Sequence, residues 1–129
     1  MTMEAGGIET AGGLKLAPAG VEWDAVKVSR WIGLEALERL KGPHGAVVVD
    51  PHERALYFLV PPRSTQGWEV QHTTPLSTAS YVVVPPAGKE AEPGIYWLTS
   101  PTHGPLHTDV DALRAAIEET LGPRGKAAR

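Results

Sequence analysis

Four short apolar runs constrain the fold of this chain more than any other feature of its sequence. They occupy residues 45–49 (GAVVV), 55–60 (ALYFLV), 81–84 (YVVV) and 95–98 (IYWL). Runs of this length that are rich in Val, Tyr, Phe and Ile are typical of β-strands. Pro-Pro pairs directly follow the second and third runs, and proline cannot donate to a strand ladder. The first two runs flank a turn sequence at residues 50–53 (DPHE) and are predicted to form an antiparallel hairpin.

Residues 21–40 are predicted to form a strand followed by a helix. Apolar and polar residues alternate over residues 21–25 (VEWDA), which indicates a strand that extends to residue 28. Ser29 can then cap a helix through residue 40, with one apolar stripe made by Ile32, Ala36, Leu37 and Leu40. The alternative is one helix from Asp24 onward, because Val28 continues the same stripe.

The last helix has the clearest sequence pattern. Thr108 and Asp111 have the spacing of a capping box, in which two side chains bond the first free N–H groups. One apolar face follows, made by Val110, Leu113, Ile117 and Leu121. The predicted order is β-α-β-β-β-β-α, an α+β fold with a mostly antiparallel sheet and two helices packed on one face.

The predicted domain covers residues 20–121. Residues 1–19 contain four glycines and little periodicity, so they are expected to form a flexible N-terminal tail. Within that tail, Leu14 and Leu16 alternate and could dock as a short edge strand. Residues 122–129 are expected to form a second flexible tail, because Gly122-Pro123 is a helix stop signal.

Composition excludes several classes of protein. The 129 residues carry a net charge of −3, whereas dedicated nucleic-acid binders usually carry a basic excess. The chain has no cysteine, so it has neither disulfides nor thiolate metal ligands. Its first residues lack the pattern of a signal peptide, and no apolar run approaches the roughly 20 residues that span a bilayer. We therefore expect a cytoplasmic protein without a membrane partner.

Two groups of polar residues are candidates for chemistry. Asp50, His52 and Glu53 could offer carboxylates and an imidazole to a metal, but the same sequence is favoured in hairpin turns for backbone reasons. His103 and His107 are four residues apart, yet the intervening Gly104-Pro105 forbids helical spacing between them. We favour the turn for the first group and expect no metal site at either.

The aromatic residues are mostly expected in the core. They include Trp23, Trp31 and Trp97, which fit alternating or helical positions beside apolar neighbours. Trp68 lies in the polar segment of residues 63–80, where it and Leu76 are candidate anchors to the core. Trp68 is also the aromatic residue most expected to be exposed and to make an interaction.

Three segments resemble a known family. Residues 54–61 (RALYFLVP), 81–87 (YVVVPPA) and 94–98 (GIYWL) are similar to the strands "G-R-H-L-Y-F-x-x-P", "Y-V-V-A-P-P-S" and "G-x-Y-x-W". In this order, these strands are those of the bifunctional primase–polymerase N-terminal domain, of the archaeo-eukaryotic primase superfamily. The resemblance spans residues 45–98. The W-D-A-V start with these strands is also similar to small actinobacterial proteins.

The departures from that family concern its catalytic residues. Ala55 stands where the family has a histidine that contacts nucleotide phosphates, and residues 77–80 (STAS) lack the family's last acid. Asp50 alone stands where a first acid is expected, and two metal ions need ligands from more than one strand. The resemblance therefore implies a shortened, catalytically silent relative.

We expect a non-catalytic regulatory or interaction module that binds a protein partner or another copy of itself. It would act through its sheet face, the segment of residues 63–80 with Trp68, or an oligomer interface. The alternative is a nucleotide or nucleic-acid binding domain with a residual phosphate pocket. The expected ligand contacts are Asp50, His52, Arg54, Arg63 and Lys89. Neither reading requires a cofactor.

Overall fold

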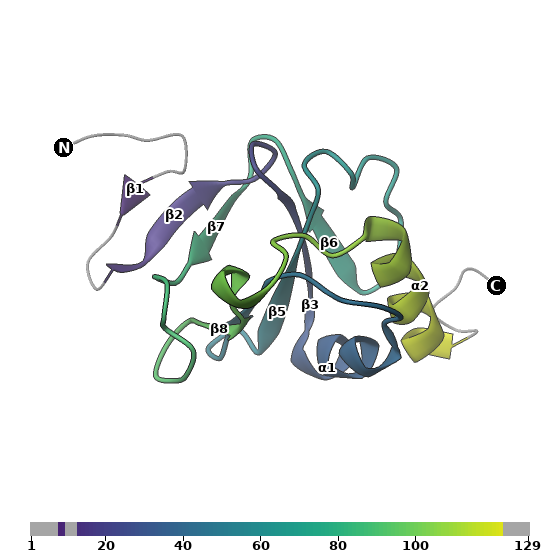
Figure 1. Ribbon diagram of the computed structural model, residues 1–129. Coiled ribbons are helices and arrows are strands. Elements are labelled where there is room, and N and C mark those ends of the chain that lie inside the picture. Colours follow the sequence, from purple (N-terminus) through teal and green to yellow (C-terminus); the bar gives the residue numbers. More distant parts are fainter. Residues whose placement is uncertain (1–7, 10–12, 123–129) are drawn as a thin grey trace.

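The computed structural model describes residues 8–9 and 13–122 (Figure 1). The remainder of both predicted tails lies outside the described residues. The elements in chain order are β1 (Ile8–Glu9), β2 (Lys15–Pro18), β3 (Asp24–Ser29), α1 (Arg30–Arg39), β4 (Val47–Asp50), β5 (Ala55–Val60), β6 (Thr73–Leu76), β7 (Tyr81–Val84), β8 (Tyr96–Thr99), the short 3-10 helix η2 (Pro101–His103) and α2 (Val110–Leu121).

The main sheet has five strands in the order β6-β3-β5-β4-β8, and all its neighbours are antiparallel. The hairpin predicted around residues 50–53 is confirmed as β4 and β5, in which Asp50 pairs with Ala55. The strands β5 and β7 end where the sequence indicates, because Pro61 directly follows β5 and Pro85 directly follows β7. Runs of β-branched residues that are buried on both faces thus become the interior of this sheet.

A second, smaller sheet has the order β1-β2-β7. The short strand considered for Leu14 and Leu16 is found in part as β2, whose register places Leu16 opposite Val83 of β7. It begins after Leu14 and lies between β1 and β7, so it is not the edge strand that was expected. Residues 15–18, assigned to the N-terminal tail, are therefore part of the folded layer. Figure 1 shows this sheet on one side of the five-stranded sheet and the two helices on the other.

The side chains of β5 divide the interior into two cores. Leu56, Phe58 and Val60 face α1 and α2, in a core with residues such as Ile32 and Ile117. Leu59 faces the opposite way, in a second core that contains Trp23 and Trp97 and lies against the small sheet. This arrangement follows from the period of two along a strand. The predicted α+β class, with both helices on one face, is confirmed.

The structure corrects the limits of the strand before α1. Its residues are Asp24–Ser29 rather than 21–28, and Val21 is exposed. Asp24, expected on the polar face, has an exposed fraction of 0%. The alternative of one continuous helix from Asp24 is wrong, since β3 pairs along its whole length with β5. The segment of residues 63–80 also contains β6, which has no counterpart among the predicted strands.

The start of α2 differs from the predicted capping box. Asp109 is the N-cap, and its Oδ2 accepts a hydrogen bond from the Ala112 N–H at 2.9 Å. Thr108 instead accepts one from the Gly45 N–H at 2.7 Å through its Oγ1, 63 positions away in sequence. The Thr108 hydroxyl, which the local pattern assigned to the start of the helix, therefore binds residue 45 instead. No helix in the described part of the chain is long and apolar enough to cross a membrane.

Candidate functional site

The β4–β5 turn uses its acid to hold the backbone. Asp50 Oδ1 accepts hydrogen bonds from the backbone N–H groups of His52 and Glu53, at 3.1 and 3.3 Å. This geometry is an Asx turn, in which a side chain replaces a backbone acceptor. The Glu53 carboxylate bonds Lys27 Nζ at 3.1 Å instead of facing Asp50. The interpretation of residues 50–53 as a hairpin turn is therefore confirmed.

The five expected ligand contacts do not form one site. Arg54 directly precedes β5 and Arg63 follows its far end, so the six residues of β5 (about 20 Å) separate them. Lys89 Nζ donates to the carbonyl oxygens of Ala91 and Pro93 within its own loop, at 2.5 and 2.6 Å. Asp50 and His52 lie at the Arg54 end, in the turn. The structure therefore does not bring all five residues to one end of β5.

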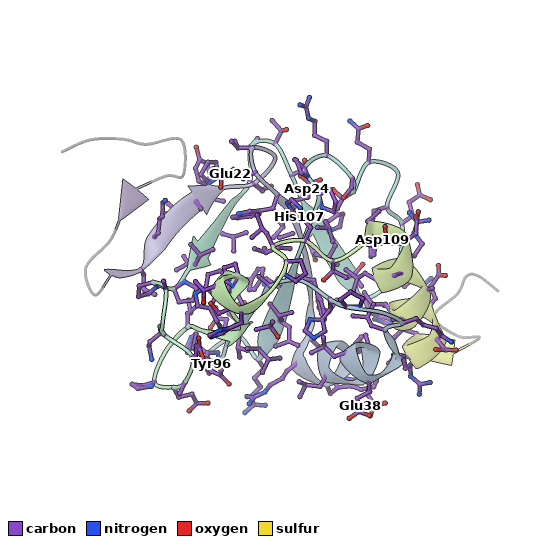
Figure 2. All side chains as sticks on the ribbon, in the orientation of Figure 1. Glu22, Asp24, Glu38, Tyr96, His107 and Asp109 are labelled. Carbon is purple, nitrogen blue, oxygen red and sulfur yellow. The ribbon has the colours of Figure 1, made fainter. Side chains whose placement is uncertain are left out.

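The two histidines near η2 have separate partners. His103 Nε2 lies 2.8 Å from Glu90 Oε2, whereas His107 Nε2 donates to the Glu22 carbonyl oxygen at 2.8 Å. Figure 2 shows His107 beside Glu22, while Asp109 lies away from both at the start of α2. Within the described residues, no three His, Asp, Glu or Cys side chains are grouped so that they could hold a metal ion.

Trp68 is a core residue rather than an exposed contact. Its exposed fraction is 6%, and its Nε1–H donates to Thr73 Oγ1 at 2.8 Å. The Arg114 guanidinium covers the ring, 5.5 Å from its centroid. The expectation that Trp68 makes an external interaction is therefore wrong, whereas its role as an anchor of the 63–80 segment is confirmed.

Asp24 is an interior carboxylate that holds two loops. Its Oδ2 accepts from the Thr65 N–H and hydroxyl at 3.2 and 2.7 Å, and its Oδ1 accepts from the Ser77 hydroxyl at 2.9 Å. Burial raises the pKa of Asp24, but hydrogen bonds from Thr65, the Arg63 backbone and Ser77 outweigh burial and hold the pKa below its ordinary value. All these donors belong to this chain, so Asp24 serves the fold rather than an external ligand.

An open hollow lies between the first turn of α1 and the β4–β5 turn. We call it the α1 groove; its volume is about 560 Å³, and its lining residues are Ser29, Arg30, Trp31, Leu34, Pro51, Glu53 and Arg54. Trp31 has an exposed fraction of 63% and Leu34 one of 42%. These residues are three positions apart and therefore share a helix face. Glu38 continues that face, and Figure 2 shows it pointing away from the sheet.

The backbone fixes the two walls of the α1 groove relative to each other. β3 runs directly into α1, with Ser29 as both the last strand residue and the N-cap. The Ser29 side chain makes no capping bond, and the Arg30 N–H donates to the Arg54 carbonyl oxygen at 2.8 Å. Arg54 has a φ of 53°, and its carbonyl continues the β3–β5 ladder one position beyond the pair of Ser29 and Ala55. One hydrogen bond thus ties the helix start to the hairpin turn.

The α1 groove has unpaired positive charges, whereas its negative charge is paired. Arg30 and Arg54 take part in no ion pair within the part of the chain that the structure describes. The groove's carboxylate, Glu53, is paired with Lys27, and this hydrogen bond raises the pKa of Lys27. An unpaired guanidinium in contact with solvent is a ready partner for a carboxylate, which it can bind through two parallel hydrogen bonds.

Of the residues that line the α1 groove, the sequence singled out Arg54 as a ligand contact, Glu53 as a possible metal ligand and Ser29 as a helix cap, but not the exposed apolar pair. Trp31 was expected in the core with most other aromatic residues, and Leu34 was not singled out. A signal was present, because neither residue belongs to the stripe of Ile32, Ala36, Leu37 and Leu40 that faces the core.

Comparisons with protein-family models, curated proteins and solved structures found no match to this chain.

Proposed function

We propose that this chain is a non-catalytic interaction module of the cytoplasm that binds a protein partner at the α1 groove. The observation that carries the proposal is the exposed side chain of Trp31 beside Leu34 and the free Arg30 and Arg54 guanidinium groups. Tryptophan and arginine are enriched among the residues that dominate binding energies at interfaces. The absence of cysteine suits a reducing compartment.

The partner that fits this surface is a short segment with an aliphatic side chain next to a carboxylate. The aliphatic group would pack on Trp31 and Leu34, and the carboxylate would bind Arg30 or Arg54. The bond between the Arg30 N–H and the Arg54 carbonyl fixes the helix start against the turn, so little ordering of the backbone is needed on binding.

No reaction is assigned to the α1 groove. Ser29 Oγ is buried and has no hydrogen-bond partner among the described residues, so no base activates it as a nucleophile. The Glu53 carboxylate is already paired with the Lys27 ammonium. The nucleotide-binding alternative has less support, since Arg54, Arg63 and Lys89 lie in separate loops.

The test is a selection from a displayed peptide library on the full chain, followed by calorimetric titration of the enriched peptides. We expect acidic-aliphatic sequences whose affinity falls at least tenfold, or about 1.4 kcal/mol, in Trp31→Ala. Arg54→Ala should weaken binding and reduce its dependence on salt. Tyr81→Ala is the matched control, because Tyr81 on β7 is similarly exposed at 60%.

Two results would contradict the proposal. In one, enriched peptides bind Trp31→Ala as tightly as the unchanged chain, or no peptide is enriched. In the other, analytical ultracentrifugation finds a dimer that Trp31→Ala dissociates, which would make a second copy of the chain the occupant of the groove. Circular dichroism of each variant checks that the fold is retained.

A further inference from the structure

The small sheet ends on one side in β7, which pairs with β2 and with no other strand among the described residues. Just before β7, the Ala19 N–H donates to the Ser80 carbonyl oxygen at 2.8 Å and continues the β2–β7 ladder. In an antiparallel ladder, the residues that exchange hydrogen bonds recur at every second position. Val82 and Val84 are therefore the residues of β7 that bond β2.

Tyr81 and Val83 carry the unpaired backbone groups of β7. Because these two residues alternate with the bonded ones, their N–H and C=O groups point away from β2. No described residue forms a hydrogen bond with these four groups. We call the four groups the β7 edge. A row of unpaired strand donors and acceptors is a template for pairing with another chain.

The β7 edge lies on a strand that reaches the surface and has no proline within it. Tyr81 has an exposed fraction of 60%, and Val83 is partly exposed. Proline commonly protects edge strands, and Pro75 lies within β6, the edge strand of the main sheet that precedes β7 in the chain. β7 has such protection only beyond its end, at Pro85.

The chain around the β7 edge carries no charge. Residues 73–88 include β6 and β7 and contain no Asp, Glu, Lys, Arg or His, although 21% of the whole chain is charged. Next to Val83 in the register is Leu16, with an exposed fraction of 36%. A charged partner finds no opposite charge here. Two copies of this chain, each with a net charge of −3, can meet here without bringing like charges together.

We propose that the β7 edge joins two copies of this chain into a symmetric dimer, in which β7 pairs antiparallel with β7 of the partner subunit. A two-fold axis at Val82 places Tyr81 opposite the partner's Val83. Because both residues have outward-pointing groups, the two symmetric pairs close four hydrogen bonds. Each Tyr81 ring then lies beside a valine side chain, a favourable cross-strand pair. The edge therefore fits itself in length, in hydrogen bonding and in charge.

Sedimentation equilibrium of the full chain over a series of concentrations tests the proposal. Four-residue strands bury little area, so we expect a reversible dimer with a micromolar dissociation constant. Val83→Pro removes one N–H of the β7 edge and none of the bonds to β2, and should raise that constant at least tenfold. Ala87→Pro is the matched control. It adds a proline at the second position of the next turn, where the Lys89 N–H donates to the Pro86 carbonyl, and should leave the dimer unchanged.

Introduced cysteines test the register, since the chain has no cysteine of its own. A mixture of the Tyr81→Cys and Val83→Cys variants should form an intermolecular disulfide on mild oxidation. In the proposed pairing these positions are opposite each other, with Cα atoms about 5.5 Å apart. Either variant alone should crosslink at least tenfold more slowly, because its two cysteines are diagonal neighbours about 7–8 Å apart.

Three outcomes would overturn the proposal: a monomer at every concentration up to millimolar, a dimer that Val83→Pro leaves intact, or a mixture of cysteine variants that crosslinks no faster than either alone. If circular dichroism shows that Val83→Pro fails to fold, the cysteine mixture still decides. Trp31→Ala should dimerise normally, because the small sheet and the helices lie on opposite sides of the main sheet (Figure 1). This measurement separates failure of the β7 edge from failure of the α1 groove.

Discussion

A buried carboxylate at the start of β3 shows how a single residue organises its surroundings. Asp24 is shielded from water, yet its charge is compatible with folding because three donors from Thr65 and Ser77 solvate it. These donors lie before and after β6, so the bonds hold the loops on both sides of β6 against β3. The cost of burying the charge is offset by bonds that are formed only in the folded chain.

Replacing Asp24 should change both stability and its dependence on pH. Because the folded pKa is lowered, the carboxylate's contribution is complete above the ordinary Asp pKa of about 4 and is lost as the pH falls through the lower folded value. Asp24→Asn puts an NH₂ group among donors and should cost about 2–3 kcal/mol at neutral pH. Urea unfolding between pH 2 and 7 (roughly the range of carboxylate titration) measures this. Equal pH dependence in both proteins would contradict the assignment.

Substitutions of Thr108 and of Asp109 should destabilise the chain by different mechanisms. Thr108→Val keeps the shape of the side chain but leaves the Gly45 N–H without its acceptor, at a cost of about 1–3 kcal/mol. Asp109→Ala removes the N-cap of α2 and should cost about 1 kcal/mol. Thermal unfolding of the two variants compares them. A larger loss in Asp109→Ala would place the main role of this segment at the helix end instead.

At the scale of elements, local sequence patterns predicted the strands and helices that depend mainly on interactions between neighbouring residues. The strands β4, β5, β7 and β8 follow from β-branched runs with proline stops, and α1 follows from the spacing of Ile32 and Ala36. β6 was missed because Thr73–Leu76 contains Pro75 and little apolar alternation. It is an edge strand that pairs only with β3 among the described strands, where proline is tolerated.

A glycine in α1 sets how closely that helix approaches the main sheet. A Cβ at Gly33 would lie 2.5 Å from Leu56 Cδ1 and 3.0 Å from Val28 Cγ2. Alanine is the better helix former by about 1 kcal/mol, but Leu56 is fully buried and cannot move aside without disturbing the core. Gly33→Ala should therefore destabilise the chain by about 1–2 kcal/mol in chemical unfolding.

Gly104→Ala provides the control for this prediction. Its Cβ would meet nothing within 4 Å, and its φ of 178° suits any residue. We expect a change near zero. Stabilisation by Gly33→Ala would mean that helix propensity outweighs packing at this interface.

At the scale of the whole molecule, the α1 groove could not be read from the sequence because long-range pairing creates it. Arg30 and Arg54 meet only because β3 pairs with β5, which brings Ser29 opposite Ala55. The core that contains Trp23 and Trp97 likewise needs residues from β2 and β8, which are far apart in the sequence. Asp50 was predicted correctly in its turn, since residues 50–53 alone determine that geometry.

The alternation along β5 has a consequence for mutational tolerance. Each residue of this central strand except Tyr57 is buried, and successive side chains from Leu56 to Val60 enter different cores. A substitution anywhere in β5 therefore disturbs one core or the other, and the strand has no neutral side on which change can accumulate. The exposed loop at residues 90–94 has no such double constraint. We therefore expect the loop at residues 90–94 to accommodate insertions and fused tags better than β5, to which both cores belong.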